Sequence, residues 1–181
     1  MPPTPPIKIN YETDINVIWI EPFDKDQHQE FCSVLNPLCK EPDTLSATDL
    51  EGQISTDLKN YRIFLCVNAT QAHDLLSSIH EKPELYLVYV LCQNQEEEEE
   101  IQKEKEKFNK IRIATSKEEE FIRKFVADIV PSLIEAADIH FEQNQNNGER
   151  WYREILKTIN RSDDDSLKNR YLPILTEKTK Q

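Results

Sequence analysis

Three strongly apolar runs constrain what this chain can fold into more than any other feature of its sequence. They cover residues 15–20, 61–67 and 85–92, and stretches with a helical spacing of apolar residues separate them. Runs of this kind are typical of strands buried on both faces of a parallel sheet. Such sheets hold ligands beyond the carboxyl ends of their strands, so the residues that follow each run are the first candidates for a site.

The rest of the pattern supplies two weaker strands and the helices between strands. A short edge strand is predicted near 44–47, and a second edge strand at 110–115, where apolar and charged residues alternate. The predicted helices cover about 26–36, a stretch from Thr48, about 70–80, about 94–109 and a long segment behind Ser116. This alternation predicts an α/β fold: a doubly wound, mostly parallel five-stranded sheet in the flavodoxin-like order 2-1-3-4-5, with helices on both faces.

Two helix starts are predicted from capping boxes, in which Ser or Thr is followed three residues later by Glu. One pairs Thr48 with Glu51, and the other pairs Ser116 with Glu119. The helix behind Ser116 carries a broad apolar face from Phe121 to Leu133. Pro131 has no backbone N–H, so we expect it to kink this helix or to start a new one.

Apolar residues return at helical spacing beyond a polar joint at 143–148. Trp151, Tyr152, Ile155 and Ile159 form a stripe that is either core packing or an interaction face. The helices that contain it and follow it either close the domain or begin a helical repeat array. We therefore predict a disordered leader over 1–14, an α/β domain over 15–142 and a C-terminal helical extension over 149–181.

The acidic composition excludes several classes of partner. The formal net charge is -12 and the pI is about 4.8. Phosphate binding needs clustered Lys and Arg, so neither nucleic acid nor an anionic membrane is expected as a partner. Residues 1–6 contain four prolines and no apolar segment of a secretory signal, and no apolar run approaches the length of a membrane span. We predict a cytoplasmic chain that binds other proteins or associates with itself.

The sequence lacks the motifs of cofactor chemistry. Its two glycines, Gly52 and Gly148, cannot build a dinucleotide-binding or phosphate-binding loop, and no cofactor is predicted. Four cysteines occur without a C-x-x-C pair, and Cys66 and Cys92 fall in predicted strands, where we expect buried, reduced thiols. No histidine stands in a motif with a nucleophile. His80 ends a predicted helix, and a structural role is expected there.

Two acidic clusters have alternative interpretations. Glu21, Asp24 and Asp26 follow the first strand, where carboxylates could hold Mg²⁺. We interpret them as a solvated acidic loop and predict no metal site. The run from Glu96 to Glu100 is interpreted as a solvated helix face, and the alternative is a contact surface for a basic partner.

The strand sequences resemble those of a group of receiver-like modules. The matching segments are 16–21 (NVIWIE), 61–68 (YRIFLCVN), Ile79-His80 and 85–92 (LYLVYVLC). Modules of this group stand ahead of tetratricopeptide repeats or ADP-ribosyltransferase-like domains in some invertebrate proteins. The resemblance covers about 15–142, and it implies the fold of a response-regulator receiver.

The resemblance also implies where a receiver's chemistry would lie in this chain. A receiver accepts a phosphoryl group on an Asp after its third strand, beside an acidic pair, a Ser or Thr and a Lys. The corresponding positions here are Glu21, Asp24, Asn68, Cys92, Thr115 and Lys117. Asn68 stands where the acceptor Asp would be, and an amide cannot form an acyl phosphate. If the chain is receiver-like, it is one that cannot be phosphorylated at this position.

Three functions are carried forward as hypotheses. The leading one is a non-catalytic receiver-like module of an intracellular signalling protein, which acts through protein interaction or regulation and has no catalytic residue. The rival is an enzyme that hydrolyses NAD and is similar to TIR domains, for which Glu21 is the candidate catalytic residue. The third is a fragment of a larger protein with tetratricopeptide repeats or an ADP-ribosyltransferase domain.

Overall fold

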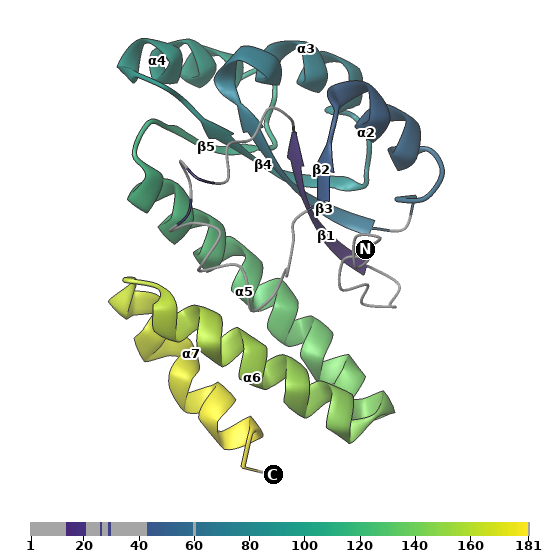
Figure 1. The fold of residues 1–181 in the computed structure, drawn as a ribbon, viewed down its shortest axis with the longest axis vertical. Coiled ribbons are helices and arrows are strands. Elements are labelled where there is room, and N and C mark those ends of the chain that lie inside the picture. Colours follow the sequence, from purple (N-terminus) through teal and green to yellow (C-terminus); the bar gives the residue numbers. More distant parts are fainter. Residues whose placement is uncertain (1–13, 21–25, 27–28, 30–42, 60, 181) are drawn as a thin grey trace.

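The computed structural model describes residues 14–20, 26, 29, 43–59 and 61–180. Its fold is mixed α/β around a parallel sheet, which confirms the predicted class. The strands are β1 (Asp14–Ile20), β2 (Asp43–Leu45), β3 (Tyr61–Asn68), β4 (Leu85–Leu91) and β5 (Ile111–Thr115). They pair in the order β2-β1-β3-β4-β5, and each pair is parallel (Figure 1). β2 has three residues and lies at one edge, and β5 lies at the other.

Helices cover both faces of the sheet. They are α2 (Ala47–Ile54), α3 (Ala69–Ile79), α4 (Gln95–Glu104), α5 (Glu118–Gln143), α6 (Gln145–Arg161) and α7 (Asp165–Lys178). Figure 1 shows α2, α3 and α4 on one side of the sheet and α5 on the other. None of the helices in the described ranges is both long and apolar enough to cross a membrane.

Alternating strand residues feed two separate cores. In β1, Val17 and Trp19 belong to the core that contains α5, whereas Ile18 and Ile20 belong to the core that contains α2, α3 and α4. The same alternation in β3 sends Phe64 to the first core and Leu65 to the second. Because both faces are covered, the strands need apolar residues at every position, which explains the continuous apolar runs of the sequence.

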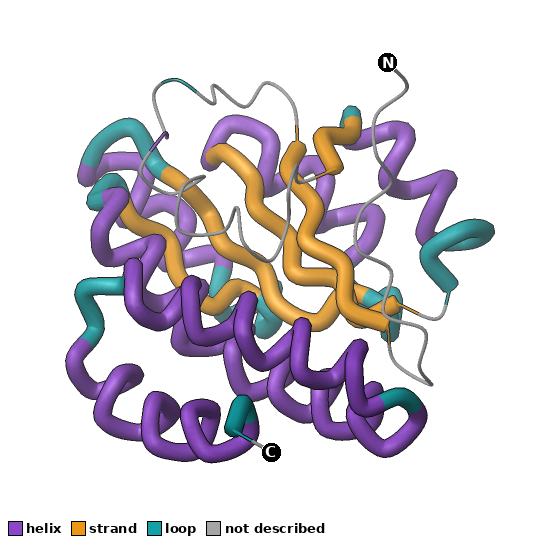
Figure 2. Tube along the Cα trace, turned by 60° about the horizontal axis from the view of Figure 1, so that its bottom comes forward, coloured by secondary structure: helices purple, strands orange, loops and turns teal. Residues whose placement is uncertain are grey.

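The C-terminal helices form a further layer on the outside of α5. Figures 1 and 2 show α6 and α7 running alongside α5 on the side away from the sheet. Tyr152, Ile155 and Ile159 of α6 and Leu167 and Leu175 of α7 are buried in the same core as α5. Of the two alternatives left open by the sequence, the structure shows these helices packing back onto the α/β unit.

The long helix α5 continues through Pro131, so the prediction of a new helix start there is wrong. Residues on both sides of the proline, including Val130 and Leu133, are buried in the core. A proline removes one backbone hydrogen bond from a helix. Apolar burial along two sides of α5 outweighs that local loss.

The polar joint predicted at 143–148 is shorter than its composition indicates. α5 ends at Gln143 and α6 begins at Gln145, so only Asn144 lies between the helices, and Gly148 is inside α6. A Cβ atom at Gly148 would lie 2.7 Å from the backbone nitrogen of Phe141 and closer still to its Cα. Gly148 is therefore required for the close approach of the two helices.

Both predicted capping boxes are misplaced. The N-cap of α2 is Ser46, whose hydroxyl oxygen accepts a hydrogen bond of 3.1 Å from the N–H of Asp49, so Thr48 lies inside the helix. The N-cap of α5 is Lys117 rather than Ser116, and its side chain makes no capping hydrogen bond. α4 also ends at Glu104, earlier than the predicted end near 109.

Several predictions fall on residues outside the described ranges. They are the leader up to residue 13, the helix near 26–36 apart from two of its residues, and the thiols of Cys32 and Cys39. Cys66 and Cys92 are described, and both are buried free cysteines, which confirms their predicted state.

Replacing Gly148 by Ala is expected to lower the free energy of unfolding by about 2 kcal/mol or more, because the added Cβ meets backbone atoms that cannot turn aside. Gly52 is the matched control, since it is exposed in α2 and a Cβ there would meet nothing within 4 Å. Gly52→Ala is expected to raise the stability by about 0.5–1 kcal/mol. Urea unfolding of the three proteins measures both effects, and a Gly148→Ala variant as stable as the wild type would contradict the described packing of α5 on α6.

Candidate functional site

The carboxyl edge of the sheet brings together three of the receiver-equivalent positions. Asn68 ends β3 opposite Leu91 of β4, and Leu91 in turn pairs with Thr115 of β5. The N–H of Cys92, just beyond β4, donates a hydrogen bond of 2.9 Å to the carbonyl of Thr115. Glu21 and Asp24 lie outside the described residues. The described part of this edge therefore presents an amide, a thiol and a hydroxyl in a row.

The space beneath this edge is filled with apolar side chains. A cavity of only about 10 Å³ remains there, lined mainly by Trp19, Cys66, Leu91 and Phe121, with Asn68 at its rim. A void of this size holds at most one water molecule. Trp19 is 1% exposed and Phe121 is 2% exposed. The residues just inside the strand ends are therefore packed as core in the described ranges, and residues 21–25, which follow β1 at this edge, lie outside them.

The Cys92 thiol is not a nucleophile at neutral pH. Burial raises its pKa to about 12, with smaller contributions from the negative charges of Glu97 and Glu98. The thiolate is the reactive form of cysteine, so a thiol with a raised pKa is inert. Cys92 acts here as a small apolar residue of the core that contains α2, α3 and α4.

Thr115 and Lys117 organise the start of α5. The Thr115 side chain is buried, and its hydroxyl oxygen accepts a hydrogen bond of 3.1 Å from the N–H of Lys117. The same hydroxyl donates a hydrogen bond of 3.4 Å to Glu120 in the first turn of the helix. These contacts turn the chain from β5 into α5 and give the Thr115 hydroxyl a structural role, whereas Lys117 takes part through its backbone N–H and is exposed.

The acidic run of α4 divides into structural and exposed residues. Asn94 caps the helix by accepting from the N–H of Glu97 at 3.0 Å, and Glu97 accepts from the N–H of Gln93 at 2.8 Å. Glu98 accepts hydrogen bonds from both the N–H and the hydroxyl of Ser116, which we call the Glu98–Ser116 contact. The remaining members, Glu96, Glu99 and Glu100, are exposed. These three keep the solvent exposure that both interpretations of the run require.

The Glu98–Ser116 contact ties α4 to the connection between β5 and α5. The two hydrogen bonds from Ser116 lower the pKa of the Glu98 carboxyl below its ordinary value, and the nearby charge of Lys117 acts in the same direction. The sequence separation of eighteen residues hides this pair from any local pattern. Its only sequence signal is a Ser directly before an expected helix start.

A second polar cluster lies on the other face of the sheet, and sequence reasoning missed it. Asp128 of α5 accepts two hydrogen bonds from the Arg112 guanidinium, at 2.8 and 3.1 Å, and one from the Tyr89 hydroxyl at 3.1 Å. Burial, followed by the charge of Asp128, raises the pKa of Tyr89. This cluster joins β4, β5 and α5. Its paired charges make it a structural tie.

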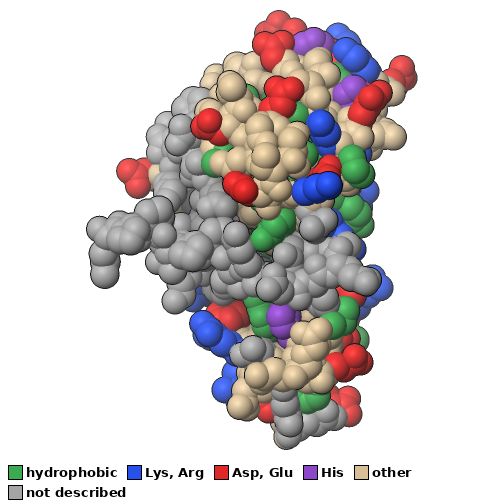
Figure 3. Space-filling view, turned by 90° about the vertical axis from the view of Figure 1, so that its right-hand side faces the viewer, with side chains coloured by type: hydrophobic (Ala, Val, Ile, Leu, Met, Phe, Trp, Pro, Cys, Tyr) green, Lys and Arg blue, Asp and Glu red, His purple; other side chains and the backbone are tan. Residues whose placement is uncertain are grey.

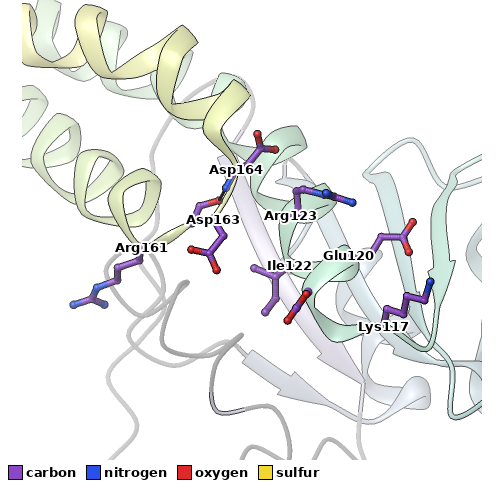
Figure 4. Close-up of a pocket in the computed structure, with 9 residues that line it drawn as sticks. Lys117, Glu120, Ile122, Arg123, Arg161, Asp163 and Asp164 are labelled. Carbon is purple, nitrogen blue, oxygen red and sulfur yellow. Dashed lines mark hydrogen bonds between the residues drawn. The ribbon is translucent and has the colours of Figure 1, made fainter.

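A cavity of about 320 Å³ lies between the start of α5 and the turn that joins α6 to α7 (Figure 4). Its lining mixes three cations with four acids: Lys117, Arg123, Arg161, Glu119, Glu120, Asp163 and Asp164. Figure 4 shows Arg161 at one side of the cavity and Lys117 with Glu120 at the other, so the charges do not converge on one point. Ser162 is buried, and its hydroxyl oxygen accepts from the N–H of Asp164 at 3.2 Å. No reaction follows from this arrangement.

The apolar stripe of α6 is core, so its interpretation as an interaction face is wrong for three of its four residues. Tyr152, Ile155 and Ile159 are buried between α5, α6 and α7. The Tyr152 hydroxyl also donates to Asp138 of α5 at 2.5 Å. Trp151 is half-buried, and its ring stacks on His140 with 6.3 Å between centroids.

His80 has the structural role expected of it. It is the C-cap of α3, and its Nδ1 lies 2.8 Å from the carbonyl oxygen of Leu76. Its ring also meets Phe108 edge-on, with 5.1 Å between centroids. The imidazole thus contacts a carbonyl oxygen at the end of α3 and packs against a buried residue of the core.

Within the described ranges, no three His, Cys, Asp or Glu residues are placed to hold a metal ion together. On the face drawn in Figure 3, acidic and basic side chains are interspersed, and hydrophobic side chains show in small separate groups. No protein-family model, curated protein or solved structure matches this chain.

Replacing Glu98 by Gln is expected to destabilise the protein at neutral pH, because a neutral amide accepts weaker hydrogen bonds than a carboxylate. The pKa of Glu98 is lowered in the folded state, so its contribution is present above the ordinary Glu pKa of about 4.3 and is lost as the pH falls through the lower folded value. The difference in unfolding free energy between variant and wild type should therefore shrink towards zero in acid. Urea unfolding across this pH range measures it.

The matched control for this measurement is Glu96→Gln, which removes an exposed charge from the same helical turn without touching Ser116. Its unfolding free energy should differ little from that of the wild type, and the difference should change little with pH. Equal effects for the two variants would mean that the Glu98–Ser116 contact contributes nothing specific.

Proposed function

We propose that this chain is a non-catalytic, receiver-like module that acts in signalling by binding another protein or a second copy of itself. The order β2-β1-β3-β4-β5 is the order of flavodoxin-like sheets, to which receivers belong. The helices also support the proposal, because α2, α3 and α4 lie on one face and α5 on the other (Figure 1). Fold alone does not define a function, and the residues at the carboxyl edge of the sheet are the ones that distinguish a phosphorylated receiver from a non-catalytic one.

The observation that carries the proposal is the side chain at the end of β3. Asn68 occupies the position at which the receiver resemblance calls for a phosphate-accepting Asp, and it is also the N-cap residue of α3. An amide is not a nucleophile for phosphoryl transfer. Trp19, Leu91 and Phe121 line a cavity of only about 10 Å³ next to it, and Trp19 and Phe121 are buried in the described residues. A module built in this way transmits a signal through its surface.

The exposed residues of α4 indicate the chemistry of a partner. Glu96, Glu99 and Glu100 are exposed on one helix of a chain with a net charge of -12. A negative surface steers a positively charged partner towards it and repels an acidic one. We expect a protein partner with a basic contact surface, and binding that weakens as the salt concentration rises.

The proposal predicts that acetyl phosphate with Mg²⁺ leaves the folded protein unmodified. Neither the Asn68 amide nor the buried Thr115 hydroxyl is activated to accept a phosphoryl group. Intact-mass spectrometry after incubation measures the result, and a receiver that carries the acceptor Asp is the positive control. A stable adduct of one phosphoryl group on the wild-type chain would contradict the proposal.

A second assay on the same preparation distinguishes the binding module from the alternative hypothesis, an enzyme that hydrolyses NAD. Purified protein incubated with NAD⁺ should release no nicotinamide above the rate of the buffer alone. Sustained release that Glu21→Gln abolishes would establish the enzyme and overturn the binding module.

A further inference from the structure

Ser116 is an exposed hydroxyl at a structural junction. It lies between Thr115, the last residue of β5, and Lys117, the N-cap of α5. The side chain is accessible to solvent, and one carboxylate oxygen of Glu98 accepts from both its N–H and its hydroxyl. Ser116 therefore helps to fix α4 against the start of α5, and its hydroxyl is accessible to an enzyme in solution.

The residues after Ser116 have the charge pattern of a substrate for an acid-directed kinase. Glu118, Glu119 and Glu120 follow it at the second, third and fourth positions. Kinases select substrates partly by charge complementarity, and acidic residues after the acceptor suit a basic substrate groove. The N-cap residue Lys117 makes no side-chain bond to the first turn of α5, so opening this turn to present the segment in extended form breaks the Thr115 contacts with Lys117 and Glu120 but no N-cap contact.

We propose that Ser116 is a phosphorylation site for an acid-directed Ser/Thr protein kinase, and that its phosphorylation breaks the Glu98–Ser116 contact and releases α4 from the start of α5. The γ-phosphoryl group of Mg-ATP is transferred to the Ser116 Oγ. The hydroxyl proton passes to the general base of the kinase, and ADP is the leaving group. This regulation goes beyond the binding role and does not depend on it.

The charges around Ser116 determine whether phosphorylation breaks the Glu98–Ser116 contact or strengthens the local structure. A phosphoserine carries a charge of about -1.5 to -2 and would stand against the Glu98 carboxylate that the hydroxyl now contacts. The N-terminal dipole of α5 attracts a phosphate by only about 0.3–1 kcal/mol at an exposed position. Glu118, Glu119 and Glu120 surround the same helix start and oppose that attraction. The net result is loss of the Glu98–Ser116 contact rather than a new ordered site.

The chain contains an internal comparison at the turn between α6 and α7. Ser162 is followed by Asp163, Asp164 and Asp165, which is a pattern at least as acidic as that after Ser116. Ser162, however, is 2% exposed, and its oxygen already accepts from the N–H of Asp164. If solvent exposure of the serine determines which site is phosphorylated, a kinase should modify Ser116 in the folded chain and leave Ser162 unmodified.

The test incubates the full chain with an acid-directed kinase and Mg-ATP and maps the modified residues by mass spectrometry. We expect phosphate on Ser116 in the folded protein, on Ser162 only after unfolding, and none at position 116 in Ser116→Ala. Glu98→Gln weakens the hydrogen bond that holds the hydroxyl and should raise the initial rate at Ser116 roughly two- to fivefold, the range that an exposed charged contact gives. Glu96→Gln is the control and should keep the wild-type rate.

Hydrogen exchange supplies the structural readout. Phosphorylation of Ser116 should speed exchange in α4 and in residues 116–120, and unmodified Glu98→Gln should reproduce part of that change. Absence of phosphate on Ser116, a Glu98→Gln rate equal to that of the wild type, or unchanged exchange after modification would each overturn the proposal.

Discussion

The apolar burial of α5 on two sides is the interaction on which the rest of this structure depends. One side of the helix packs on β1, β3 and β4 through residues such as Phe121 and Phe125, and the other side packs on α6 through residues such as Ala137. Ten residues of α5 are buried. This helix unites the sheet and the C-terminal helices in one core, and the burial explains why it continues past Pro131 and why Gly148 must lack a side chain.

The same packing fills the interior next to the carboxyl edge of the sheet in the described residues. Trp19 and Phe121 are buried and line a cavity of only about 10 Å³ near the carboxyl ends of β1 and β3. The polar groups left at the edge serve local structure: Thr115 holds the start of α5, and Cys92 is kept protonated by burial. Glu96, Glu99 and Glu100 of α4 and Ser116 are, in contrast, exposed in the described part of the chain.

Sequence patterns predicted what is local and periodic. The runs at 61–67 and 85–92 became β3 and β4 within one residue, and the helical spacing at 70–80 became α3, because burial on a sheet imposes those periods directly. The failures involve partners far apart in sequence. Ser116 bonds to Glu98 instead of capping α5, and the choice between core and interaction face that the sequence left open for Tyr152 is decided by contacts with Asp138 of α5 and Lys178 of α7. The spacing of residues within one segment contains no information about a partner in another segment.

The central claim is that the strand residues just inside the carboxyl edge of the sheet are packed core, and the reactivity of the Cys66 thiol tests it most directly. Cys66 lines the small cavity beside Trp19 and Phe121. With Cys32, Cys39 and Cys92 replaced, labelling by a small neutral thiol reagent can be followed at low urea concentrations. The account predicts labelling only through unfolding, with a rate that rises with urea in step with the unfolding equilibrium. Fast labelling in native buffer, independent of urea, would reveal an open cleft and contradict the account.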